Sequence, residues 1–147
     1  MMWGAIFYAR KTQLVDIPCN LNAARYRDEV LTQHMPPTMN LRMEVFQHGN
    51  ARPHTSRATV DFLANKNVTV LPWPSKSPDL NPIEHLWDEL DRRVRIRQPV
   101  PQTLQELQQA LQQAWRRILQ DRIRRWIECM PRRLRAVLHA NDGNNIY

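Results

Sequence analysis

The sequence of 147 residues contains no apolar run long enough to cross a membrane, so we expect no transmembrane helix. Its apolar start lacks the basic first residues and the small-residue cleavage site of a signal peptide. Only two cysteines occur, Cys19 and Cys129, far apart and without metal-ligand spacing. We interpret them as reduced thiols of an intracellular protein. Hydrophobic residues make up 42% of the chain, which argues against disorder.

Lysine is also scarce, and the positive charge is carried by arginine. Of the 21 basic residues 18 are arginine, and the net charge is +7. Twelve arginines lie between Arg92 and Arg135, where only three acidic residues occur. Such a basic region attracts polyanions because each phosphate contact releases condensed counterions. On composition alone, a solvated helical surface rich in arginine is nearly as good an interpretation.

The first half of the chain alternates between strand and helix patterns. Strands are predicted over residues 1–9, 13–17, 43–47 and 68–71, and helices over 23–34 and 55–64. The order is therefore strand, strand, helix, strand, helix, strand. It favours an α/β fold in which helices cover a mixed sheet.

A proline-rich loop divides the chain. Residues 72–82 contain four prolines and are predicted to form a stiff, irregular loop. A helix should begin directly after it, because Asn81 can act as N-cap and Pro82 suits the first helical position. This helix is predicted to run to about Arg95.

Three further helices are predicted towards the C-terminus. Thr103 and Glu106 form a capping-box pattern that should start the first of them. A second is expected around residues 123–127, and a third from Pro131. The first helix is expected to carry one apolar stripe, formed by Leu104, Leu107, Leu111, Trp115 and Ile118.

Three stretches have unusual residue combinations. They are residues 2–4 (Met-Trp-Gly), 46–54 (Phe-Gln-His-Gly-Asn-Ala-Arg-Pro-His) and 73–87 (Trp-Pro-Ser-Lys-Ser-Pro-Asp-Leu-Asn-Pro-Ile-Glu-His-Leu-Trp). Together they resemble the Val-Trp-Gly, Phe-Gln-Gln-Asp-Asn-Ala-x-x-His and Trp-Pro-x-x-Ser-Pro-Asp-Leu-Asn-Pro-Ile-Glu-x-x-Trp motifs of mariner-superfamily (Tc-type) transposases. The resemblance covers about residues 2–140.

The resemblance implies an RNase H-like fold in which two aspartates and a glutamate hold two Mg²⁺ or Mn²⁺ ions. Hard divalent cations prefer carboxylate oxygens, and such an ion pair can activate an attacking oxygen and stabilise the leaving one. It also implies DNA and other transposase subunits as partners, and a nuclear location. Residues 1–97 would form a partial catalytic domain and residues 98–147 its C-terminal helical extension.

The family's three carboxylates are not all matched. Glu84 matches the family's glutamate, but Gly49 occupies the position of its second aspartate. The 34 residues between them give the spacing typical of this family branch. The first aspartate would lie on the central strand of the sheet, which would precede Met1 and is expected to be missing. We therefore expect an incomplete metal site that binds no ions productively, and with it the loss of catalysis.

Neighbouring residues are poor replacements for the missing carboxylate. His48 should point away from the site along a strand, and imidazole is a poor ligand for Mg²⁺. Asp79 matches the family's own Ser-Pro-Asp loop. Asp88 and Asp91 share a helix stripe with Glu84, but solvated acidic stripes are more common than metal sites.

Glu84 and His54 each have a structural alternative. Three positions after Asn81, Glu84 could serve the backbone of that residue in a helix cap. His54 matches a family histidine and could contact a phosphate, although a histidine hydrogen-bonded within its own turn is the more common arrangement.

Three hypotheses about function remain. One is an active metal-dependent nuclease or strand-transfer enzyme with another ligand set. Another is a partner that pairs with intact transposase subunits and inhibits them. The hypothesis that we prefer is a degenerate transposase fragment with generic DNA affinity through Lys76, Arg92, Arg93, Arg95, Arg97, Arg116, Arg117, Arg124 and Arg125.

Overall fold

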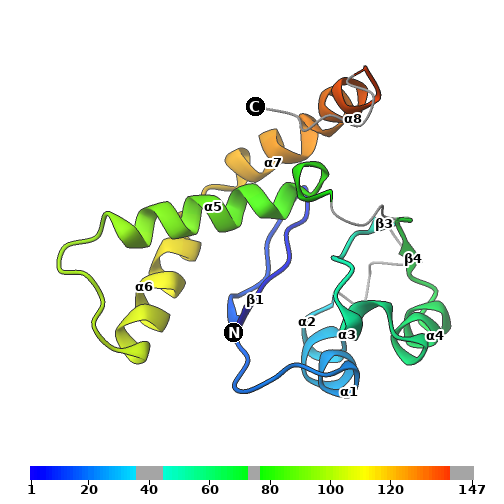
Figure 1. Cartoon of the computed structure of the whole chain (residues 1–147), viewed down its shortest axis with the longest axis horizontal. Coiled ribbons are helices and arrows are strands. Elements are labelled where there is room, and N and C mark those ends of the chain that lie inside the picture. The colour runs from blue at the N-terminus through cyan, green and yellow to red at the C-terminus, as the bar shows by residue number, and fades with distance from the viewer. Residues whose placement is uncertain (36–44, 73–76, 140–147) are drawn as a thin grey trace. The chain divides into compact units, whose positions relative to one another are not determined.

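The chain forms a mixed α/β fold of two compact units in a computed structural model that describes residues 1–35, 45–72 and 77–139. Unit 1 comprises Met1 and Ile17–Lys76, and unit 2 comprises Met2–Asp16 and Ser77–Tyr147. Figure 1 shows their helices and strands.

Unit 1 contains one long helical segment, as the sequence predicts. It consists of α1 (Ala23–Arg25), the π-helical η1 (Tyr26–Leu31) and α2 (Thr32–His34). The Asn22 side chain caps its start by accepting a hydrogen bond from the Arg25 N–H at 2.9 Å. The π-helical turn was not predicted, and such turns are rare. It carries the buried side chains Tyr26, Val30 and Leu31.

The sheet of unit 1 is small. Strands β3 (Val45–Phe46) and β4 (Thr69–Val70) pair in parallel, in the two places where strands were predicted but over fewer residues. Between them lie α3 (Arg52–Thr55), which was not predicted, and α4 (Arg57–Asn65). Ser56 caps α4 by accepting from the Thr59 N–H. Leu63 is buried on the inner face of α4.

Unit 2 begins with a β-hairpin. Strand β1 (Met2–Trp3) pairs antiparallel with β2 (Val15–Asp16), and an isolated bridge joins Ile6 to Lys11. The hairpin is where the sequence predicts two strands, although regular pairing is confined to its open end. Trp115 secures the hairpin by donating its indole N–H to the Thr12 carbonyl at 2.7 Å.

The rest of unit 2 is helical. It contains the 3₁₀ turn η3 (Pro78–Leu80) and the helices α5 (Pro82–Arg95), α6 (Leu104–Arg117), α7 (Gln120–Glu128) and α8 (Met130–His139). All four helices were predicted, and Thr103 and Glu106 form the predicted capping box of α6. The turn η3 lies in the predicted irregular loop. Among the described residues, no helix combines the length and apolar character needed to span a membrane.

The core of unit 2 joins the hairpin to three helices. Buried residues from the hairpin, α5, α6 and α7 form one cluster: Leu14, Leu86, Leu90, Ala114, Trp115, Ile118 and Ile123. Trp87 and Trp126 pack against this cluster. The tryptophans at 87, 115 and 126 therefore serve packing, while Trp73 lies outside the described residues.

The apolar stripe predicted for α6 is wrong at its N-terminal end. Leu104 is 72% exposed and Leu107 is 37% exposed. The buried side chains of α6 are Ala110, Ala114 and Trp115, so small residues bring this helix close to its neighbours. The domain boundary predicted at residue 97 stays a prediction, and α5 and α6 on either side of it pack together.

Gly4→Ala tests the packing of the hairpin on α6. A Cβ at Gly4 would lie 2.5 Å from the Trp115 ring, so the ring or the hairpin must move. We expect the free energy of unfolding to fall by about 1–3 kcal/mol in denaturant titrations followed by tryptophan fluorescence. The matched control is Gly49→Ala, whose Cβ would meet only His54 Nδ1 at 3.8 Å. Equal stability of the two variants would contradict this account.

Candidate functional site

Glu84 lies in the first turn of α5. The Asn81 side chain caps this helix by accepting the Ile83 N–H at 3.4 Å, and it donates from Nδ2 to Glu84 Oε1 at 3.3 Å. The Asn81 backbone N–H donates instead to the Pro78 carbonyl at 2.8 Å. The interpretation of Glu84 as a partner for the Asn81 backbone is therefore wrong, because η3 already satisfies that N–H group.

The Glu84 carboxyl is partly withdrawn from water. Burial raises the pKa of Glu84, and the nearby charge of Asp88 raises it further. Asp91, the third acid of the predicted stripe, forms an ion pair with Arg95 at 2.6 Å. Within the ranges that the structure describes, no three His, Cys, Asp or Glu side chains come together in a way that could hold a metal ion.

Gly49 lies in the turn between β3 and α3. Its carbonyl accepts a hydrogen bond from His54 Nδ1 at 2.9 Å. The histidine is thus bonded within its own turn, as the sequence favours. An added Cβ at position 49 would meet nothing closer than 3.8 Å, so the turn has room for a Cβ but holds no carboxylate.

A stack of aromatic rings surrounds this turn. The centroids of the His48 and His54 rings are 5.1 Å apart, and the two ring planes are inclined by only 7°. The centroid of the Tyr26 ring is 4.3 Å from that of His54. The Tyr26 hydroxyl and His48 Nδ1 are 3.3 Å apart. The expected orientation of His48 assumed strand alternation, but β3 ends at Phe46, so that reasoning does not apply. Parallel imidazole planes also cannot direct lone pairs from both rings at one ion.

Both histidines favour their neutral form. Burial lowers the pKa of His48 to about 4, and the neighbouring His54 contributes to the lowering. Burial also lowers the pKa of His54, although its hydrogen bond to Gly49 opposes this shift. The two imidazole rings beside Gly49 are therefore uncharged near neutral pH.

The described residues do not fit a two-ion site. Gly49 offers no side-chain ligand, and the Glu84 carboxyl contacts the Asn81 side chain. Asp79 and Asp88 are exposed, with Asp88 on the same helix as Glu84. Each carboxylate that the sequence offers near Glu84 thus lacks the companions that a divalent ion pair requires.

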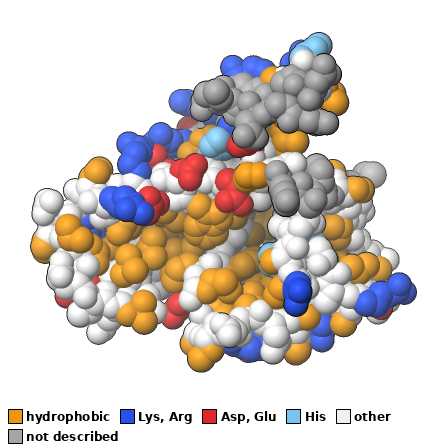
Figure 2. Space-filling view, viewed as in Figure 1, with side chains coloured by type: hydrophobic (Ala, Val, Ile, Leu, Met, Phe, Trp, Pro, Cys, Tyr) orange, Lys and Arg blue, Asp and Glu red, His pale blue; other side chains and the backbone are white. Residues whose placement is uncertain are grey.

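Most of the arginines predicted to bind DNA already have protein partners. Arg92 and Arg93 form ion pairs with Glu89, and Arg95 pairs with Asp91. Arg97 donates to Gln113 Oε1 at 2.8 Å and Arg124 to Asp121 Oδ1 at 2.8 Å. Figure 2 shows basic side chains interleaved with acidic ones over the upper part of the face that it draws.

Three of the predicted arginines are not engaged in this way. In the part of the chain that the structure describes, the side chains of Arg116, Arg117 and Arg125 are exposed and make no hydrogen bond or ion pair. They lie at the end of α6 and in α7. Lys76 falls outside the described residues.

Comparison with known proteins defines the family. Residues 1–108 match the family described as DDE superfamily endonuclease. The transposase of the element Tcb1 of Caenorhabditis briggsae is 38% identical over 144 residues, which cover 95% of this chain and 51% of that protein. The Tc1 transposase of Caenorhabditis elegans is 36% identical over 146 residues, which cover 96% of this chain and 52% of that protein.

Solved structures lead to the same family. The Mos1 transposase catalytic domain with raltegravir and Mn superposes with a TM-score of 0.73 and 25% identity, over 99% of this chain and 83% of that one. The Mos1 mariner paired-end complex with Mn gives a TM-score of 0.72 and 25% identity, over 91% of this chain and 40% of that one.

The matched domain defines the class: this chain belongs to the DDE superfamily endonucleases. Within that class it is homologous to the Tc1/mariner transposases, and its fold is the RNase H-like fold of the Mos1 catalytic domain. Mos1 catalytic-domain structures contain Mn or Mg, which supports divalent-metal use in the family. The chain spans about half the length of the transposases it matches.

Acid should destabilise unit 1 through His48. The fold depresses the pKa of His48 to about 4, so the unfolded chain, with a pKa near 6.5, takes up the proton first. The stabilisation is therefore complete above pH 6.5 and is lost as the pH falls towards 4. We expect the midpoint temperature of thermal unfolding to decrease when the pH is lowered from 7.5 to 5. The decrease should be smaller in His48→Gln. The same decrease in both proteins would contradict a role for His48.

Proposed function

We propose that this chain is a transposase-derived DNA-binding protein that does not carry out the metal-dependent phosphodiester chemistry of its family. The observation on which this rests is Gly49, which stands where the family's motif has an aspartate. The turn around it supplies two neutral imidazoles and a main-chain carbonyl already bonded to His54. None of these replaces a carboxylate between two hard cations.

The absence of one carboxylate has a large effect because the two ions share their ligands. A divalent ion pair is held together by negative charge that offsets its own repulsion, and glycine contributes none. Glu84 alone supplies one charge from a carboxyl whose pKa is already raised by burial. The proposed function of this chain therefore includes neither hydrolysis nor strand transfer.

DNA binding is supported by the arginine content of unit 2. Arg116, Arg117 and Arg125 are exposed and are not neutralised within the described residues. Long-range attraction to a polyanion depends on this surplus charge and not on a particular base sequence. For Mos1, a relative of the same fold, structures include a complex with the left transposon end. From the family resemblance alone we also propose the nucleus as the place of action.

The main alternative is an active nuclease or strand-transfer enzyme that uses an unorthodox ligand set. Glu84 favours it, since the residue that matches the family's glutamate is retained in the first turn of α5. An inhibitory partner of intact transposase subunits is a further proposal, and co-purification with a full-length relative would test it.

Nicking assays separate the inactive protein from the active alternative. We expect supercoiled plasmid to remain intact with the purified chain in Mg²⁺ or Mn²⁺, because Gly49 leaves the ion pair without a ligand. Glu84→Ala provides the background of contaminating nuclease, and the two proteins should give the same trace. Metal-dependent nicking by the native chain that Glu84→Ala abolishes would overturn the proposal.

DNA affinity should depend steeply on salt. We expect labelled duplex DNA to bind at low salt and the logarithm of the binding constant to fall linearly with the logarithm of salt concentration. Replacing Arg116 and Arg117 by glutamine should make this slope shallower by about 1 for each phosphate that is no longer neutralised. Arg57→Gln is the control, because Arg57 lies in unit 1, away in sequence from the arginine-rich region of residues 92–135. Absence of binding at low salt would remove DNA binding from the proposed function.

A further inference from the structure

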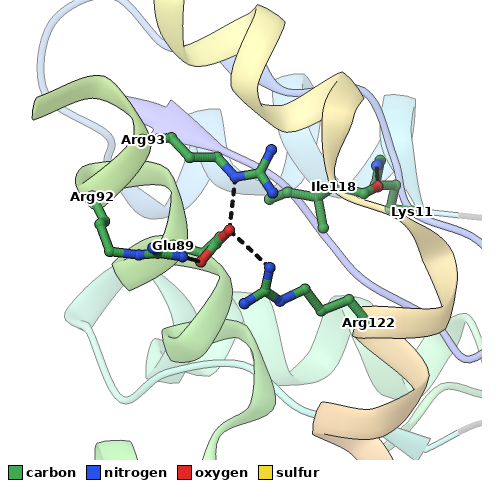
Figure 3. Close-up of polar contacts among 6 residues, drawn as sticks. All are labelled: Lys11, Glu89, Arg92, Arg93, Ile118 and Arg122. Atoms are coloured by element: carbon green, nitrogen blue, oxygen red, sulfur yellow. Dashed lines mark hydrogen bonds and ion pairs between the residues drawn. The ribbon is translucent and has the colours of Figure 1, made fainter. Parts of the chain in front are cut away.

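A single buried carboxylate in unit 2 holds three arginines. Glu89 of α5 is only 6% exposed, and it accepts hydrogen bonds from Arg92, Arg93 and Arg122. The distances are 2.7 Å from Arg93 Nε and 3.1 Å from Arg122 Nη1. Figure 3 shows the three guanidinium groups converging on this carboxylate from α5 and α7.

The charges of this cluster do not balance. Three guanidinium groups face one carboxylate, and Lys11 of the hairpin lies nearby, donating to the Ile118 carbonyl. Burial lowers the pKa of Lys11, and the charge of Arg93 lowers it further. One guanidinium would suffice to neutralise Glu89. The cluster therefore carries excess positive charge, and its guanidinium groups repel one another. An anion bound at the surface of the cluster would relieve this repulsion.

The arginines are held in place and still have donors to offer. A guanidinium carries five N–H donors, and each arginine gives Glu89 one hydrogen bond. No further hydrogen-bond or ion-pair partner of these three side chains occurs in the described part of the chain. Arg122 also lies over the Trp126 ring, 5.8 Å from its centroid, which restricts its movement.

The cluster can be reached from solvent. The side chains of Arg92 and Arg122 are 61% and 47% exposed, although the carboxylate that holds them is buried. Donors fixed in this way lose little conformational freedom when they bind a ligand. Planar guanidinium groups match the geometry of phosphate oxygens and form strong charge-assisted hydrogen bonds with them.

We propose that Arg92, Arg93 and Arg122, oriented by Glu89, form a binding site for a backbone phosphate of DNA. This inference rests on the proposed DNA binding and assigns one contact surface to it. It adds Arg122, which lies outside the predicted set, and it gives Glu89 the role of a positioning residue that touches no phosphate itself. Ion pairing with Glu89 therefore orients these guanidinium groups for contact with DNA and still leaves N–H donors available for a phosphate.

The test compares matched variants of the full chain. Binding of a labelled duplex of about two helical turns is followed by fluorescence anisotropy across a salt series. We expect Arg92→Gln to make the salt slope shallower by about 1, and Arg92→Gln with Arg122→Gln by about 2. Arg57→Gln removes the same charge from an arginine that is 90% exposed in unit 1, and it should leave the slope unchanged.

The outcomes distinguish the site from the function. If the wild-type chain binds DNA and the double variant keeps its slope, the arginines only neutralise Glu89 and the proposed site is wrong, while the proposed function stands. If the wild-type chain does not bind at low salt, the function and the site both fail. Thermal unfolding of each variant shows whether it folds. Arg92→Gln alone, which leaves two guanidinium groups on Glu89, decides the question if the double variant does not fold.

Discussion

The contact between Gly4 and the Trp115 ring holds the parts of unit 2 together. Because residue 4 has no side chain, the hairpin can lie directly against the indole, which also donates its N–H to the Thr12 carbonyl at 2.7 Å. Trp115 belongs to the core cluster that includes Leu86 and Leu90 of α5. The hairpin and α6 therefore share one core with α5, the helix that carries both Glu84 and Glu89.

The parts of this fold that local chemistry controls could be predicted from the sequence. Asn81 and Thr103 each cap the helix that they were expected to start, because a cap depends on residues only two or three positions apart. The exposure of Leu104 could not be predicted in this way. Which face of α6 is buried depends on what packs against it, and the alanines at 110 and 114 decide that.

The candidate site shows the same division. A family motif was enough to locate Gly49 and Glu84, and the spacing of Glu89 to Arg92 and Arg93 on one helix is visible in the sequence. Arg122 follows Glu89 by 33 residues and reaches it only because α5 and α7 pack together. The ring stack of Tyr26, His48 and His54 likewise depends on tertiary contacts that no local pattern records.

The hydrogen bond from His54 to the carbonyl of residue 49 has an evolutionary consequence. A carbonyl belongs to the main chain, so this bond forms whichever side chain position 49 carries. A Cβ at position 49 would also meet nothing closer than His54 Nδ1 at 3.8 Å. Neither this hydrogen bond nor steric crowding of a Cβ would therefore select against a change at this position, whereas selection for catalysis would preserve the acid in a lineage.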